Sequence, residues 1–317
     1  MLRRGVVVAG AGIVAAVLLV RRRRRRELAM LGPAGAAPPL ASREHGRTLV
    51  LFDVDGTLAV PAQPAESEMV AALAALRERY AIGIVGAGDF EKQQGQLGGA
   101  GLRGRLDFVF SENGVHAFRG ARLLHCKSLA DQLGAARWAE FQARLDGILA
   151  SCRAEAQQLL TRALAEGGGA DAAAAAELGA RGTFLEKRTC TVNVCVIGRT
   201  PALSKGARAA FDRVDREAGL RARVLARLVH EFGPATPFRL TFSIGGQIGI
   251  DCAPCGWDKT FCLQFVDAAE FDTIHFFGDK TAPGGGDHEL YEHPRTVGHT
   301  VTSPKDTIAQ LKHLFLE

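Results

Sequence analysis

The sequence lacks the features that would assign it to several common functional classes. Its seven cysteines have no disulfide-scaffold spacing, and Cys252 and Cys255 form a lone Cys-x-x-Cys without a second pair or suitably spaced histidines. This argues against a zinc site and favours free thiols in a reducing compartment. The +5 net charge of the whole chain less the +7 of residues 1–30 leaves −2 for the remainder. The composition of the body therefore gives no indication of nucleic-acid binding.

The first 26 residues contain an apolar segment, residues 5–20, between two groups of arginines. As a helix it would span about 24 Å at about 1.5 Å per residue. This is less than the roughly 30 Å hydrocarbon layer, but flanking arginines can snorkel. Because the larger charge group follows the apolar segment, the pattern favours a signal anchor over a cleavable signal peptide. We therefore expect a membrane-anchor helix within residues 1–26 and a body that faces the cytosol.

Two other interpretations of this segment stay open. The pattern Gly10-x-Gly12-x-x-Ala15 resembles a dinucleotide-binding fingerprint, but that motif requires a βαβ unit and an acidic residue about 20 positions later. Arginines and a stretch rich in proline, glycine and alanine follow instead. Organelle targeting fits the arginine-rich, acid-poor composition better, although serine is scarce. Residues 27–46 are expected to be a linker.

The body alternates between strand and helix patterns, which is typical of a parallel sheet in a doubly wound α/β fold. Strands are predicted at 48–53, 82–85, 108–110, 238–244 and 273–277. Helices are predicted at 66–78, 136–164, 205–217 and 221–231. Because long helices precede strands within residues 124–254, we expect an inserted second domain there, between core segments 47–123 and 255–317. The low-complexity residues 167–177 are predicted to be a loop insertion or a helix extension, and not a functional site.

Residues 49–58 point most directly to a function. An apolar strand ends in Asp53, and Asp55, Gly56 and Thr57 follow. Residues i and i+2 of a strand share a face, so both carboxylates are expected at the carboxyl end of the strand, where α/β folds bind ligands. Two carboxylates this close require a cation, and Mg²⁺ prefers oxygen ligands. One aspartate can then attack phosphorus while the other transfers the proton.

Two later segments supply the remaining parts of a phosphate site. Asp279 follows an apolar strand and a glycine, and is predicted to be a third protein ligand of Mg²⁺. Asp287, in the glycine-rich segment after it, is expected to support the metal site, and His288 to be a structural hydrogen-bonding residue. Lys259 offers a cation that would neutralise the nucleophile and the transferring phosphoryl group.

Together these motifs resemble the eukaryotic-type α-phosphomannomutases of the haloacid-dehalogenase-like (HAD) superfamily over about residues 48–316. The segments that carry the resemblance are 82–92, 108–114, 181–184, 193–199, 241–247, 256–259 and 278–281. It implies a HAD-like Rossmannoid core (a parallel sheet) with an inserted α/β cap, and a homodimer formed through the cap. The implied reaction interconverts D-mannose 6-phosphate and α-D-mannose 1-phosphate, with Mg²⁺ and a hexose 1,6-bisphosphate (mannose or glucose) as activator. Such a product would feed GDP-mannose synthesis and protein N-glycosylation.

The resemblance also implies a role for individual residues. In the core, Asp53 would be the nucleophile, Asp55 the acid/base and Lys259 the lysine beside the phosphate, while Asp53, Asp55 and Asp279 would bind Mg²⁺. In the cap, the residues implied to bind substrate are three arginines that contact phosphate and one carboxylate that contacts sugar hydroxyls: Arg188, Arg199, Arg208 and Asp251. Arg208 aligns with the family pattern only after a gap of two residues.

Three positions depart from the family pattern. Ala62 stands where the family has an arginine, and Gly88 and Gly249 stand where it has serines that contact phosphate and sugar. Each departure removes a donor, and one charge-assisted hydrogen bond is worth about 1.5–3 kcal/mol. Two further functions therefore stay open: an Mg²⁺-dependent sugar-phosphate or hexose-bisphosphate phosphatase, and a catalytically weak, membrane-tethered binding protein.

Overall fold

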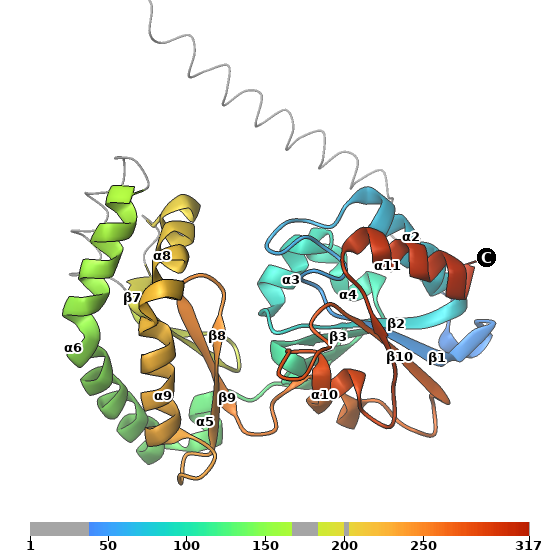
Figure 1. Ribbon diagram of the computed structural model, residues 1–317. Coiled ribbons are helices and arrows are strands. Elements are labelled where there is room, and N and C mark those ends of the chain that lie inside the picture. Colours follow the sequence, from blue (N-terminus) through green and yellow to red (C-terminus); the bar gives the residue numbers. More distant parts are fainter. Residues whose placement is uncertain (1–37, 167–182, 200–202, 317) are drawn as a thin grey trace, which may run out of the picture.

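The computed structural model describes residues 38–166, 183–199 and 203–316, and these form two units that each contain one sheet (Figure 1). The larger sheet has seven strands in the order β11-β10-β1-β2-β3-β4-β5. Strands β11, β10, β1, β2 and β3 run parallel to one another, and β4 pairs antiparallel with both β3 and β5. The strands are β1 (His45–Phe52), β2 (Tyr80–Val85), β3 (Phe108–Ser111), β4 (His116–Arg119), β5 (Arg122–His125), β10 (Thr273–Gly278) and β11 (Val297–Thr300).

Helical elements cover both faces of this sheet, so its central strands are apolar on both sides. In β1, Val50 and Phe52 face one core cluster and Leu49 and Leu51 face the other, which is the alternation expected of a strand. The first face is covered by α2 (Ser67–Arg79), α3 (Phe90–Gln96), α4 (Leu102–Arg105) and α11 (Pro304–Leu311). The second face is covered by the 3₁₀ segment η4 (Lys259–Phe265) and α10 (His288–Tyr291).

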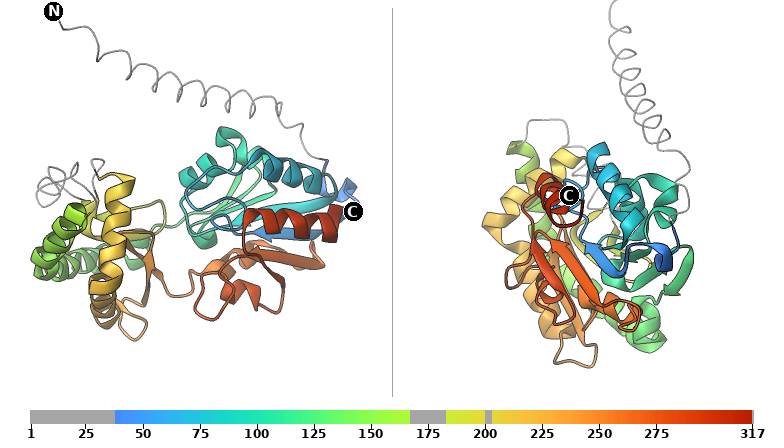
Figure 2. Two further views of the ribbon diagram at one scale, coloured as in Figure 1. Left: turned by 45° about the horizontal axis from the view of Figure 1, so that its top comes forward. Right: turned by 90° about the vertical axis from the view of Figure 1, so that its right-hand side faces the viewer.

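The second unit is built from residues that lie between β5 and β10 in the sequence. Its four strands are antiparallel in the order β6-β7-β9-β8. They are β6 (Thr183–Lys187), β7 (Val192–Arg199), β8 (Leu240–Gly245) and β9 (Gly249–Pro254). One face packs against long helices (Figures 1 and 2), namely α6 (Ala135–Glu166), α8 (Lys205–Ala218) and α9 (Leu220–Phe232), and the short α5 (Leu129–Leu133) precedes them. We call this unit the cap and the other the core; the predicted boundaries at 124 and 254 stay predictions.

The strands and helices predicted from the sequence are all present, and most of their ends agree within three residues. Part of the predicted linker packs against the core. The buried Arg43 donates to Asp107 at 2.7 and 2.9 Å and to the carbonyl of Tyr80 at 2.8 Å. The bounds of the linker, 27–46, stay a prediction.

No helix in the described ranges is both long enough and apolar enough to cross a bilayer. The membrane-anchor helix predicted within residues 1–26 and the loop insertion predicted at 167–177 both lie outside those ranges.

Candidate active site

The carboxyl ends of β1 and β10 bring Asp53 and Asp279 together. The two strands are neighbours with Phe52 opposite Phe277, and the amide of Asp53 donates to the carbonyl of Phe277 at 2.9 Å. Gly56 has a φ of +93°, and a Cβ atom there would lie 2.4 Å from an oxygen of Asp279. The chain therefore turns sharply at Gly56, after the strand, and the absence of a side chain there leaves room for the carboxylate of Asp279.

A third carboxylate, Asp287, completes a cluster. Oxygen atoms of Asp53, Asp279 and Asp287 all lie within 4.8 Å of one another. Lys259 inserts its buried ammonium between two of them, with Nζ 2.5 Å from Oδ1 of Asp53 and 2.5 Å from Oδ1 of Asp287. The other oxygen of Asp287 accepts a hydrogen bond from the amide of Lys280 at 2.8 Å. One cation thus faces three carboxylates.

The electrostatics of this cluster favour a further cation. Burial and the neighbouring Asp287 raise the pKa of Asp53 to about 6, although Lys259 opposes them. Burial and Asp287 likewise raise the pKa of Asp279. Oδ1 of Asp279 is buried and has no hydrogen-bond partner among the described residues. An oxygen-only set with one unpaired buried atom and excess negative charge fits Mg²⁺, which takes oxygen ligands.

The Asp55 carboxylate does not belong to this cluster. It forms an ion pair with Lys92, and its Oδ1 accepts from Nε2 of Gln96 at 2.8 Å and from the amide of Ala62 at 3.0 Å. Burial alone would raise the pKa of Asp55, but these hydrogen bonds hold it below its usual value. The predicted roles of Asp55 as acid/base and as metal ligand both stay predictions.

Lys92 and Gln96 were not identified as site residues from the sequence, although Lys92 is the last residue of the segment 82–92 that resembles the family. They belong to α3, which begins after the loop that follows β2. The side chain of Asp89 caps this helix by accepting from the amide of Lys92 at 2.8 Å. An aspartate that starts a helix directly after a parallel strand is the available sequence signal, since helix N-termini at this sheet edge bind phosphate.

The cap brings three of the four predicted substrate residues together around Asn193. Asp251 lies opposite Asn193 in the β7–β9 pair and accepts from its amide nitrogen at 2.8 Å. Arg188 contacts the same oxygen of Asp251 at 3.0 Å, and Arg199 donates to Oδ1 of Asn193 at 3.2 Å. Arg199 also pairs with Glu186 at 3.2 Å. Asn193, which the sequence analysis did not single out, therefore links Asp251 to Arg199.

Arg208 is not part of this group. It lies in the first turn of α8 and donates from Nε to the carbonyl of Leu203 at 3.2 Å. It was also the least secure match to the family pattern, and its predicted role stays a prediction.

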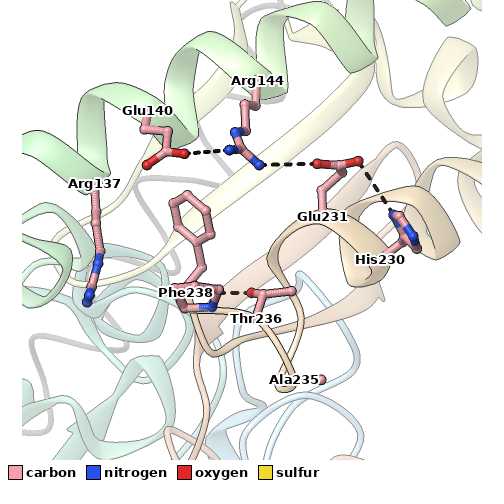
Figure 3. A pocket seen from close by; sticks show the side chains of 9 residues that line it. Arg137, Glu140, Arg144, His230, Glu231, Ala235, Thr236 and Phe238 are labelled. Atoms are coloured by element: carbon pink, nitrogen blue, oxygen red, sulfur yellow. Dashed lines mark hydrogen bonds and ion pairs between the residues drawn. The ribbon is translucent and has the colours of Figure 1, made fainter.

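A separate pocket of about 370 Å³ lies in the cap, between α6 and α9 (Figure 3). Its charged side chains largely satisfy one another, since Arg144 pairs with both Glu140 and Glu231, and His230 also contacts Glu231. It contains none of the predicted site residues. The carboxylate cluster of the core, together with the arginine-bearing sheet of the cap, is therefore the candidate active site.

Comparison with known proteins gives a consistent result. The family model described as eukaryotic phosphomannomutase matches residues 69–150 and 175–317. The phosphomannomutase of Schizosaccharomyces pombe is 40% identical over 282 residues, covering 88% of this chain and 99% of the relative. That of Glycine max is 40% identical over 88% of this chain and 100% of the relative. The phosphomannomutase of Saccharomyces cerevisiae is 40% identical over 87% of this chain and 97% of the relative.

Proposed function

We propose that this chain, which belongs to the eukaryotic phosphomannomutase family, interconverts mannose 6-phosphate and mannose 1-phosphate. The observation that carries the proposal is the buried cluster in which Lys259 holds Asp53 at the carboxyl end of β1. An aspartate in this position can accept a phosphoryl group and return it to a second oxygen of the sugar.

In the proposed reaction, an oxygen of Asp53 attacks the phosphorus of a hexose 1,6-bisphosphate. The bond between phosphorus and the sugar oxygen breaks, and that oxygen leaves with a proton supplied by Asp55. In the return step, a hydroxyl of the bound hexose monophosphate attacks the aspartyl-phosphate and gives its proton to Asp55. Phosphate is conserved over the cycle, and the bisphosphate acts as the activator.

Lys259 stays charged during this cycle. Burial alone favours the neutral amine, but Asp53 and Asp287 raise the pKa of Lys259. Its ammonium can therefore neutralise negative charge that develops on the transferring phosphoryl group. Lys92, which pairs with Asp55, would release it when substrate phosphate binds, and this release would let Asp55 take up the proton that it needs as an acid.

Mg²⁺ would be held by Asp53, Asp279 and Asp287, with Asp55 as the further ligand implied by the sequence. When bound, the metal would neutralise phosphate oxygens during transfer. In the cap, Arg188, Arg199 and Arg208 would hold the non-reacting phosphate because guanidinium groups bind phosphate with two parallel hydrogen bonds. Asp251 would accept from sugar hydroxyls.

The test uses the full chain with mannose 1-phosphate, Mg²⁺ and a catalytic amount of glucose 1,6-bisphosphate. Mannose 6-phosphate and free phosphate are followed together, with Asp53→Asn as the control. Mannose 6-phosphate without stoichiometric free phosphate, lost in the control, is the expected result. Free phosphate as the main product would instead identify a phosphatase, in which Ala62, Gly88 and Gly249 no longer retain the bisphosphate. The absence of both products would favour the tethered binding protein.

We also propose that residues 5–20 tether the chain to a membrane with the body on the cytosolic side. Their apolar composition and the arginines at residues 21–26 support this proposal. In alkaline extraction of cell membranes, the full chain should remain with the membrane and a chain that begins at residue 38 should be released. Release of both would exclude a spanning tether. A homodimer through the cap, implied by the family, is a separate proposal that sedimentation of the chain lacking residues 1–37 would test.

A further inference from the structure

A buried glutamate of the core holds the turn between β6 and β7 of the cap. Glu112 begins the 3₁₀ turn η3 (Glu112–Gly114) directly after β3 and is 1% exposed. Its Oε2 accepts from the amides of Cys190 at 3.0 Å and Thr191 at 2.6 Å, and from the Thr191 hydroxyl at 2.6 Å. This carboxylate thus connects two units whose sheets are separate.

These hydrogen bonds favour one position of the turn. A carboxylate in a buried setting is costly unless donors satisfy it. The three donors that reach Oε2 of Glu112 all belong to Cys190 and Thr191 of the cap. If the turn moved away from the core, the Glu112 carboxylate would lose these three hydrogen bonds. The position in which the turn contacts Glu112 is therefore favoured.

The backbone around Glu112 also connects this residue to the loop that follows β2 in the core. Glu112 and Asn113 have φ values of +48° and +62°, a conformation that is unfavourable for glutamate. Their amides donate to the carbonyls of Gly88 and Gly86, each at 3.0 Å. Such strain persists where surrounding contacts impose it, and it clusters at functional sites. Glu112 therefore lies between the loop after β2 and the cap.

The turn that Glu112 holds also carries Arg188. The amide of Arg188 donates to the carbonyl of Thr191 at 3.0 Å, which closes the turn. The side chain of Arg188 then reaches Asp251 on β9. Holding Thr191 in place therefore also holds the backbone of Arg188, the first of the cap residues implied to bind substrate.

We propose that Glu112 is a positioning residue that sets the Arg188-bearing turn of the cap against the loop of residues 86–88 in the core while sugar phosphate binds. This inference rests on the proposed function, because it takes Arg188 to contact the non-reacting phosphate. Glu112 acts through Arg188 and touches no reacting atom.

The test compares the full-length wild type with Glu112→Ala, Thr191→Val and Thr191→Ser. Valine has the shape of threonine without its hydroxyl, and serine keeps the hydroxyl, so the last two are matched. Hydrogen-exchange mass spectrometry follows residues 186–192, and calorimetry gives the Kd for mannose 1-phosphate with Mg²⁺. Glu112→Ala should exchange about tenfold faster in this turn alone and bind about tenfold more weakly. Thr191→Val should weaken binding several-fold, and Thr191→Ser by less than twofold.

Three results would overturn the positioning role. The first is faster exchange of the turn with an unchanged Kd, and the second is an equal loss of affinity in Thr191→Val and Thr191→Ser. The third is faster exchange throughout both units, which would indicate a purely structural contact. Mutase turnover of the wild type separates the two proposals. An active wild type with any of these results contradicts only the role of Glu112, whereas an inactive wild type contradicts the proposed function itself.

Discussion

At the scale of single residues, Lys259 lies between two buried carboxylates of the core site and neutralises part of their charge. Replacing Lys259 with methionine keeps most of the side-chain volume but leaves Asp53 and Asp287 without their cation. Breaking a buried ion pair typically costs 3–5 kcal/mol. We therefore expect the free energy of unfolding without metal to fall by about 3 kcal/mol, measured by urea denaturation, and phosphotransfer to be lost.

Lys280 provides the matched control for this prediction. It lies next to Asp279 in the sequence but is exposed. Replacing it with methionine should change the free energy of unfolding by no more than about 0.5 kcal/mol, as is usual for surface positions. Equal effects at both lysines would contradict the importance given to the buried ammonium.

Gly88 and Gly249 stand where the family pattern has serine, and replacing each with serine should affect the binding of mannose 1-phosphate differently. A Cβ at Gly249 would lie 2.4 Å from Oδ1 of the buried Asn193, whereas a Cβ at Gly88 would meet only the flexible side chain of Lys92, at 3.1 Å. Gly249→Ser should therefore displace Asn193 from Asp251 and weaken binding of mannose 1-phosphate by about fivefold, or about 1 kcal/mol. Gly88→Ser should bind at least as well as the wild type. If calorimetry shows that Gly249→Ser binds mannose 1-phosphate more tightly than the wild type, the expected displacement of Asn193 from Asp251 is contradicted.

The sequence predicted the residues whose chemistry is visible in a motif and missed those that depend on the tertiary fold. Asp53 and Lys259 stand 206 positions apart, yet their distinctive local motifs identified both. Glu112 and Asn193 lie in two segments that carry the resemblance, but neither was given a role, because each makes its contacts only when strands from distant segments come together. The carboxylate cluster likewise contains Asp287, which was predicted only to support the metal site, and it does not include Asp55, which pairs with Lys92.

At the scale of elements, the start of α3 should matter for catalysis as well as for stability. Asp89 caps this helix, and Lys92 in its first turn pairs with Asp55. Asp89→Ala should lower the free energy of unfolding by about 1 kcal/mol, the usual effect of losing such a cap. It should also lower kcat several-fold, because Lys92 is no longer held.

Ser128, which caps α5 in the cap through the amide of Asp131 at 3.1 Å, is the comparison. Ser128→Ala should cost a similar amount of stability and leave kcat unchanged. If urea denaturation and steady-state kinetics show the two variants losing activity in parallel, the helix cap has no special role at the site.

Elements with a strong pattern were predictable, and short or mixed elements were less so. Strand β1 and helix α6 have clear apolar patterns, and their observed ends differ from prediction by at most three residues. Strands β4, β5 and β11 have four residues each and mix polar with apolar side chains, whereas β3, of the same length, is an apolar run that was predicted. The antiparallel edge that β4 and β5 add to the parallel sheet was therefore not foreseen.

At the scale of the whole molecule, a residue that precedes the predicted start of the core at residue 47 contributes to the packing of the core. Arg43 is buried against Asp107 and the carbonyl of Tyr80. A chain that begins at residue 47 would leave Asp107 without this partner, and we expect a loss of about 3 kcal/mol relative to a chain that begins at residue 38. Equal free energies of unfolding for the two chains would mean that Arg43 contributes nothing to the fold.

The central claim, that Asp53 carries the phosphoryl group, can be tested by labelling. The full chain is mixed with Mg²⁺ and glucose 1,6-bisphosphate that contains radioactive phosphate, and the acid-quenched protein is mapped by peptide. The account predicts label on the peptide that contains Asp53, its absence in Asp53→Asn, and its transfer to a sugar bisphosphate when mannose 1-phosphate is added. Label on another residue, or its release only as free phosphate, would contradict the account.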